Sequence, residues 1–170
     1  ALSEFKEANR FGDFDFSPHF YSASVLEYES HLTPDPVKQK EFLTKALGEI
    51  QSGIALKPEK PLFYSWDALV YQELGNENGY RNALEMTVRF NPVEGIYEYD
   101  QLAALYNHEK EYQKVIDLAH KALSYYPLDL YDNPYWVNPD KATVWKQVAD
   151  IYLQLSIAYT KTGDTARAKE

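Results

Sequence analysis

One residue spacing occurs three times in this chain and constrains its fold more than any other feature. Each copy has a tyrosine, a small residue four positions later, and a second tyrosine three positions after that. Self-similarity at a period near 34 residues predicts stacked helical hairpins, because one hairpin cannot bury its own apolar face. Pro92 and Pro127 end the first two copies at the same distance. The tyrosine pairs are Tyr64 and Tyr71, Tyr99 and Tyr106, and Tyr152 and Tyr159.

The charge of the chain limits the partners that it can bind. The 170 residues include 17 Lys and Arg against 26 Asp and Glu, which gives a formal net charge of -9. A nucleic-acid backbone or an anionic membrane surface needs a basic footprint, so both are disfavoured as partners. We expect a neutral or basic protein or peptide instead.

Other features of the composition leave the compartment undecided. The absence of Cys excludes disulfides and thiolate metal sites but suits an oxidising or a reducing compartment. No run approaches 18 apolar residues, so we expect no direct membrane insertion by this chain. Its first residues show no signal-peptide pattern, and both a cytoplasmic and an extracytoplasmic location stay open.

Helical periodicity covers most of the chain and is interrupted by Pro, Gly and polar residues. Asp35 is a plausible N-cap before Pro36, and Gly75 can adopt the left-handed conformation that ends a helix. Residues 128–140 contain two prolines and no helical period, which indicates an inserted loop. The predicted helices are 2–11, 20–32, 36–56, 62–74, 78–90, 94–107, 111–126 and 141–162.

The repeated residues resemble the tetratricopeptide repeat (TPR) family. Two stretches carry the resemblance best: Tyr99, Leu102, Ala103, Tyr106, Tyr112, Ala122 and Pro127, and Tyr152, Leu155, Ser156, Tyr159, Gly163 and Ala168. The first copy departs from the pattern, because Asp67 replaces the usual leucine and Tyr80 replaces a small residue. The resemblance implies an all-α, right-handed α-solenoid of three to four TPR-like hairpins, with the inserted loop near 128–140.

The domain organisation follows from the same resemblance. We expect an N-terminal helix and linker over residues 1–17, followed by one helical repeat domain over residues 18–170. The predicted repeats cover approximately 18–60, 61–94, 95–127 and a truncated 141–170. Because the last repeat lacks most of its second helix, we expect the parent protein to continue and helix 141–162 to mediate weak self-association.

The resemblance implies a protein-protein interaction scaffold, a TPR module of a larger protein that binds a peptide or protein segment in its concave groove. Some family members hold a peptide carboxylate with Lys, Asn and Arg, but Ser65, Leu69, Asp100 and Ala104 at the equivalent positions cannot supply a charge-assisted donor. A narrower likeness over residues 90–97 is to the soluble region of bacterial O-antigen ligase and polymerase proteins. It implies an extracytoplasmic accessory domain of a membrane glycosyltransfer enzyme, and this alternative stays open.

Residue patterns for catalysis, metals or cofactors would indicate a function other than binding. No two of the four histidines have the i, i+4 spacing of a zinc site, and the seven glycines form no phosphate loop. Serine and carboxylate residues show no nucleophile elbow or acid–base pair. We therefore predict no catalytic residues, no metal and no cofactor, and a chain that is not itself an enzyme.

The partner groove is predicted from the positions that the repeat leaves on its inner face. Most tyrosines of the repeated spacing are expected in the core, which leaves other aromatic, acidic and amide residues for recognition. Tyr135 and Trp136 have a second interpretation, in which they fill the gap left by the inserted loop. The predicted groove residues are Ser65, Trp66, Asp100, Gln101, His108, Tyr131, Asn133, Tyr135 and Trp136.

Overall fold

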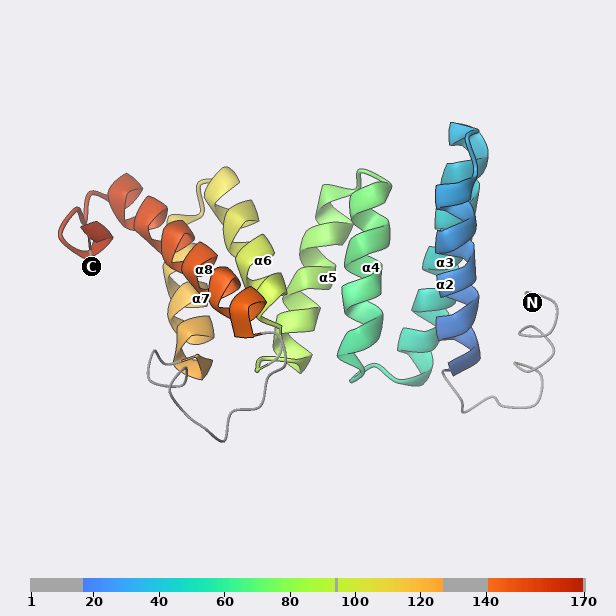
Figure 1. The fold of residues 1–170 in the computed structure, drawn as a ribbon, viewed down its shortest axis with the longest axis horizontal. Coiled ribbons are helices and arrows are strands. Elements are labelled where there is room, and N and C mark those ends of the chain that lie inside the picture. The colour runs from blue at the N-terminus through green and yellow to red at the C-terminus, as the bar shows by residue number, and fades with distance from the viewer. Residues whose placement is uncertain (1–16, 94, 127–140, 170) are drawn as a thin grey trace. The chain divides into compact units, whose positions relative to one another are not determined.

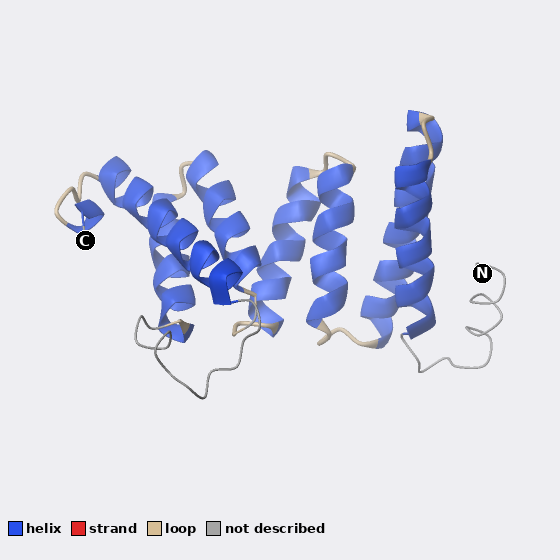
Figure 2. Ribbon diagram, viewed as in Figure 1, coloured by secondary structure: helices blue, strands red, loops and turns tan. Residues whose placement is uncertain are grey.

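The computed structural model describes residues 17–93, 95–126 and 141–169, and within them the chain is helical (Figure 1). Helices account for 84% of these residues, and no strand occurs among them (Figure 2). This confirms the predicted all-α fold, while helix 2–11 and the loop 128–140 lie outside the described residues. The elements are α2 (Ser17–Leu32), α3 (Pro36–Leu56), α4 (Pro61–Glu73), α5 (Glu77–Phe90), α6 (Ile96–His108), α7 (Tyr112–Tyr125), α8 (Lys141–Thr162) and the 3-10 helix η2 (Arg167–Lys169).

Local sequence signals account for where the helices begin and end. The Asp35 carboxylate accepts a hydrogen bond from the Val37 backbone N–H at 2.9 Å, which caps α3 before Pro36 in its first turn. After α4, Gly75 has φ +67°, a conformation that glycine adopts without a steric penalty. Lys110 reaches φ 64° in the turn between α6 and α7. These signals place each helix within two residues of its predicted bounds, except that α2 begins three residues earlier.

The chain divides into two compact units, which are described separately: unit 1 (Ala1–Phe90) and unit 2 (Asn91–Glu170). In unit 1, α2 pairs with α3, α4 pairs with α5, and α3 also packs against α4. The α3–α4 contact is close at Gly53, where a Cβ atom would lie 2.2 Å from the Phe63 ring. The buried core of unit 1 contains Ala23, Leu26, Leu43, Ala46, Ile50, Phe63 and Val70.

In unit 2, the helices α6, α7 and α8 all pack against one another. Val115, Ala119 and Ala122 form the buried stripe of α7. The segment after α8 folds back on that helix, since the Ser156 hydroxyl donates to the Ala168 carbonyl at 2.8 Å.

The tyrosine positions were predicted correctly in most copies of the repeated spacing. Four of the six are buried, and Tyr71 is half-buried. Tyr152 was expected in the core, but this is wrong because 39% of it is exposed. On α8 the buried face follows Val148, Ile151 and Leu155, and Tyr152 lies about 100° around the helix from Ile151. The four buried tyrosines are Tyr64, Tyr99, Tyr106 and Tyr159.

Candidate functional site

A group of polar side chains lies where α6 and α8 pack against each other in unit 2, and we name it the α6–α8 polar cluster. On α8 its members follow at intervals of four residues, which places them on one face of the helix. On α6 two members are seven residues apart, which is two helical turns. The cluster consists of Asp100, Gln101 and Asn107 from α6, and Lys146, Asp150 and Gln154 from α8.

Side-chain hydrogen bonds hold this cluster together across the two helices. The Asn107 amide Nδ2 donates to the Gln154 backbone carbonyl at 3.0 Å and to Gln154 Oε1 at 2.9 Å. Gln101 Nε2 donates to Asp100 Oδ2 at 3.3 Å. On α8, Lys146 Nζ lies 3.0 Å from Asp150 Oδ2. These bonds fix the orientation of the amides, so the acceptors of the cluster have defined positions.

The electrostatics of the cluster favour an incoming donor or cation. Burial raises the pKa of the Asp100 carboxyl, and the nearby Asp150 carboxylate raises it further. Hydrogen bonds from Gln154 and Gln101, and the charge of Lys146, act in the opposite direction. Within the described part of the chain, the buried oxygens Asp100 Oδ1 and Asn107 Oδ1 receive no hydrogen bond. Unsatisfied buried acceptors are costly.

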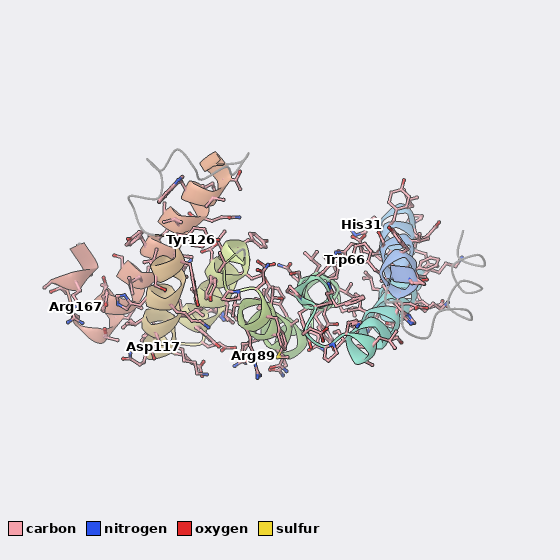
Figure 3. The ribbon with its side chains drawn as sticks, turned by 90° about the horizontal axis from the view of Figure 1, so that it is seen from below. His31, Trp66, Arg89, Asp117, Tyr126 and Arg167 are labelled. Carbon is pink, nitrogen blue, oxygen red and sulfur yellow. The ribbon has the colours of Figure 1, made fainter. Side chains whose placement is uncertain are left out.

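One of the two predicted groove residues of unit 1, Trp66, packs against the core of that unit. Figure 3 labels Trp66 of α4. This residue is partly buried, and its ring centroid lies 5.0 Å from that of Phe20. Both rings pack against the buried core of unit 1. Ser65, the neighbouring residue, is half-buried. Trp66 therefore contributes aromatic packing, and only the remaining exposed part of its ring is available to a partner.

The structure places the other predicted site residues as follows. Asp100 and Gln101 belong to the α6–α8 polar cluster, whereas His108 is an exposed residue at the end of α6. Ser65 and Trp66 are in unit 1, so the predicted set is divided between the two units. The remaining four, Tyr131, Asn133, Tyr135 and Trp136, lie outside the described residues.

Sequence reasoning missed four members of the cluster. Three of them, Lys146, Asp150 and Gln154, repeat every four residues in a helix whose bounds were predicted correctly. This spacing of polar residues on one helix face could have indicated the cluster, but the prediction for this helix used its apolar positions only. Asn107 had no comparable signal, because its partner Gln154 is 47 residues away in the chain.

One further carboxyl group is buried, but in a different setting. Asp67 of α4 is only 8% exposed, and burial raises its pKa to about 7. Its Oδ1 atom receives no hydrogen bond from the residues that the structure describes. Tyr64 and Tyr71 lie on the same face of this helix. Burial is the largest cause of the raised pKa of both phenols, and the Asp67 charge raises it further. Asp67 thus occupies an apolar position in unit 1.

No helix in residues 17–93, 95–126 or 141–169 is both long and apolar enough to cross a membrane. No protein-family model matches the chain, and no curated protein sequence matches it. Solved structures do resemble it. A crystal structure of TTC0263, a thermophilic TPR protein of Thermus thermophilus, gives a TM-score of 0.62 at 16% identity, and the match covers 90% of this chain and 72% of that one.

Two crystal structures of MamA are also similar to this chain. Their TM-scores are 0.56 and 0.54, with 14% and 16% identity, and each match covers 98% of this chain. The matches cover 80% and 84% of the two MamA chains. These comparisons give no support to the narrower likeness to O-antigen ligase. Likeness at such low identity shows the fold alone, and the chain has the TPR-like helical-repeat fold that its tyrosine spacing predicted.

Proposed function

We propose that this chain is a protein-interaction scaffold that binds a peptide or protein segment, and that the α6–α8 polar cluster receives a basic side chain of that partner. The observation that carries the proposal is the state of Asp100. This carboxyl group is partly buried beside a second carboxylate, Asp150, and its Oδ1 atom receives no hydrogen bond within the described residues. A guanidinium or ammonium group beside the two carboxylates would reduce their repulsion, and a rotation of the Asp100 carboxyl group would bring Oδ1 to its N–H donors.

The magnitude of such an interaction is sufficient for recognition. A hydrogen bond to a charged group contributes about 1.5–3 kcal/mol, which corresponds to a factor of about 10 to 100 in affinity. The side chains of Asn107 and Gln154 are already held by the hydrogen bond between them, so they lose little conformational entropy when the partner binds.

The overall charge of the chain supports the same choice of partner. A net charge of -9 attracts basic segments over a distance of about 8–10 Å at physiological ionic strength. This attraction raises the association rate, while the buried carboxylate determines which side chain is retained. An accessory role in a membrane glycosyltransfer enzyme would use the same surface, but no observation of the described residues favours that second function.

An array of random 12-residue peptides, probed with the labelled full chain, tests the proposal. We expect the retained peptides to be enriched in Lys and Arg, and we expect Asp100→Asn to weaken their binding by about tenfold or more. Asp117→Asn is the matched control, because this exposed residue of α7 changes the net charge equally but lies outside the cluster. Binding without basic enrichment, or an equal loss in both variants, would contradict the proposal.

A further inference from the structure

Three side chains of types that can bind a metal ion, from two helices, lie close together at one place in unit 1. Glu27 and His31 are four residues apart on α2, and Glu73 is the last residue of α4. His31 Nε2 lies 3.0 Å from Glu27 Oε1 and 3.2 Å from Glu73 Oε1. One ligand atom from each of the three residues lies within 4.8 Å of the other two. Figure 3 marks His31 on α2.

The packing of unit 1 explains why these groups meet. Leu26, which precedes Glu27, is buried in the core of unit 1, and Leu74, which follows Glu73, packs against the same core. The two carboxylates are therefore carried by backbone that the core holds in place, although α2 and α4 are far apart in the sequence. His31 is 52% exposed, so a metal ion can reach the imidazole from solvent.

The donor set indicates the class of ligand. One imidazole nitrogen with two carboxylate oxygens suits a borderline divalent ion such as Zn²⁺, which accepts both donor types. Mg²⁺ and Ca²⁺ prefer oxygen ligands only, so an imidazole makes the site unfavourable for them. Three protein ligands leave a fourth tetrahedral position for water or for a group of another molecule.

We propose that Glu27, His31 and Glu73 form a Zn²⁺ site that joins α2 to the end of α4. The ion takes the lone pair of His31 Nε2 and contacts both carboxylates, which otherwise accept a hydrogen bond from that nitrogen. The Nε2 proton passes to Nδ1 of a neutral imidazole, or to the buffer when the imidazole is charged. Protons and Zn²⁺ compete for the ligand atoms of this site, so Zn²⁺ binding is weaker in acid than at neutral pH. The bound ion stabilises unit 1, because the three ligands are together only in the folded chain.

Isothermal titration calorimetry of the full chain with ZnCl₂ at pH 7.5 and pH 5.5 tests this site, together with thermal unfolding with and without Zn²⁺. We expect one equivalent of Zn²⁺ to bind at pH 7.5, a rise in melting temperature that EDTA reverses, and no rise with MgCl₂. Glu73→Gln keeps a hydrogen-bond acceptor beside His31 but lacks the anionic ligand, so we expect its affinity for Zn²⁺ to fall about tenfold or more. His31→Ala should abolish the binding.

Two variants serve as controls. His108→Ala removes an exposed histidine of unit 2, and His19→Ala removes a histidine of α2 that has Glu49 Oε2 at 2.8 Å. Both should keep the Zn²⁺ affinity of the parent chain, and far-UV circular dichroism checks that every variant is folded. If the parent chain shows no Zn²⁺ heat, if His31→Ala retains the affinity, or if the affinity is equal at both pH values, the three residues form an ion-paired cluster only and the proposal is overturned.

Discussion

Asp67 gives the most direct test of the link between burial and stability in this chain. The equivalent residues of the other two copies are Leu102 and Leu155, which are buried. Asp67 is buried to the same extent, and its Oδ1 atom receives no hydrogen bond in the described part of the chain. A charge at this position is unfavourable, so the folded chain keeps the carboxyl group protonated up to a pKa of about 7.

The expected magnitude follows from the two pKa values of this group. The ordinary pKa is 3.8 and the folded value is about 7. Between them the folded chain holds a proton that the unfolded chain releases, so the free energy of unfolding decreases as the pH rises from about 4 to about 7 and is then constant. At 1.36 kcal/mol per pKa unit the whole decrease is about 4 kcal/mol. Water that reaches the carboxyl group reduces this, and we expect about 2–4 kcal/mol.

Urea unfolding of the parent chain and Asp67→Asn at pH 4 to 8 measures this effect. Asparagine has nearly the same shape but cannot ionise, so other titrating groups cancel when the two free energies are subtracted. Trp66 fluorescence, with Trp136→Phe and Trp145→Phe in both proteins, reports on unit 1. We expect Asp67→Asn to gain about 2–4 kcal/mol relative to the parent between pH 4 and pH 8. A difference that does not change with pH would refute the reasoning.

Two further pairs of variants test the packing within each unit by urea unfolding. Gly53→Ala should destabilise unit 1 by about 1–3 kcal/mol, because its Cβ would lie 2.2 Å from the Phe63 ring, whereas Gly48→Ala in the same helix meets no atom within 4 Å and should gain about 0.5–1 kcal/mol. If both substitutions changed the free energy of unfolding in the same direction, the close α3–α4 contact at Gly53 would be contradicted. In unit 2, Tyr106→Ala should cost about 3–5 kcal/mol as a loss of buried area, and Gln101→Ala less than about 1 kcal/mol. Equal costs would show that the helix face of α6 is assigned wrongly.

The helices could be predicted because their signals are local. The apolar spacing, the Asp35 cap and Gly75 each act within a few residues, and the apolar spacing of α8 predicted its bounds without error. Tyr152 was misplaced because a spacing shared between copies was taken as evidence of burial. Its exposure depends on which face of α8 meets α6 and α7, and this is a property of the packed unit.

The sites could be predicted only in part, since their contacts join distant residues. Asp100 and Gln101 were predicted from their positions in the repeat. Gln154 was not predicted, because only the packing of α8 against α6 brings it to these residues. His31 has no second histidine at the i, i+4 spacing of a zinc site, so the local sequence around it does not indicate a metal. The acceptor that completes its cluster, Glu73, is 42 residues away. Such pairs are set by the stacking of hairpins and leave no local pattern in the sequence.

Two carboxyl groups should separate stability from binding: the buried Asp67 in α4 and the partly buried Asp100 in α6, each on the first helix of its hairpin. Asp67 faces an apolar core position and has no charged partner among the described residues that lowers its pKa, so it costs stability and offers nothing to a partner. Asp100 is held by Gln101 and Gln154 beside Lys146, so its charge is partly compensated within the cluster.

We therefore expect Asp67→Leu to raise the free energy of unfolding at pH 8 by about 2–4 kcal/mol and to leave the affinity for basic peptides unchanged. Asp100→Asn should change the free energy of unfolding by less than about 1 kcal/mol and weaken the same peptides by about tenfold or more. Denaturation and peptide titration of both variants, in the same buffer at pH 8, measure the four values. If Asp67→Leu weakens binding as much as Asp100→Asn does, the buried carboxyl of α4 is part of the recognition surface and the assignment of the site to the α6–α8 polar cluster is wrong.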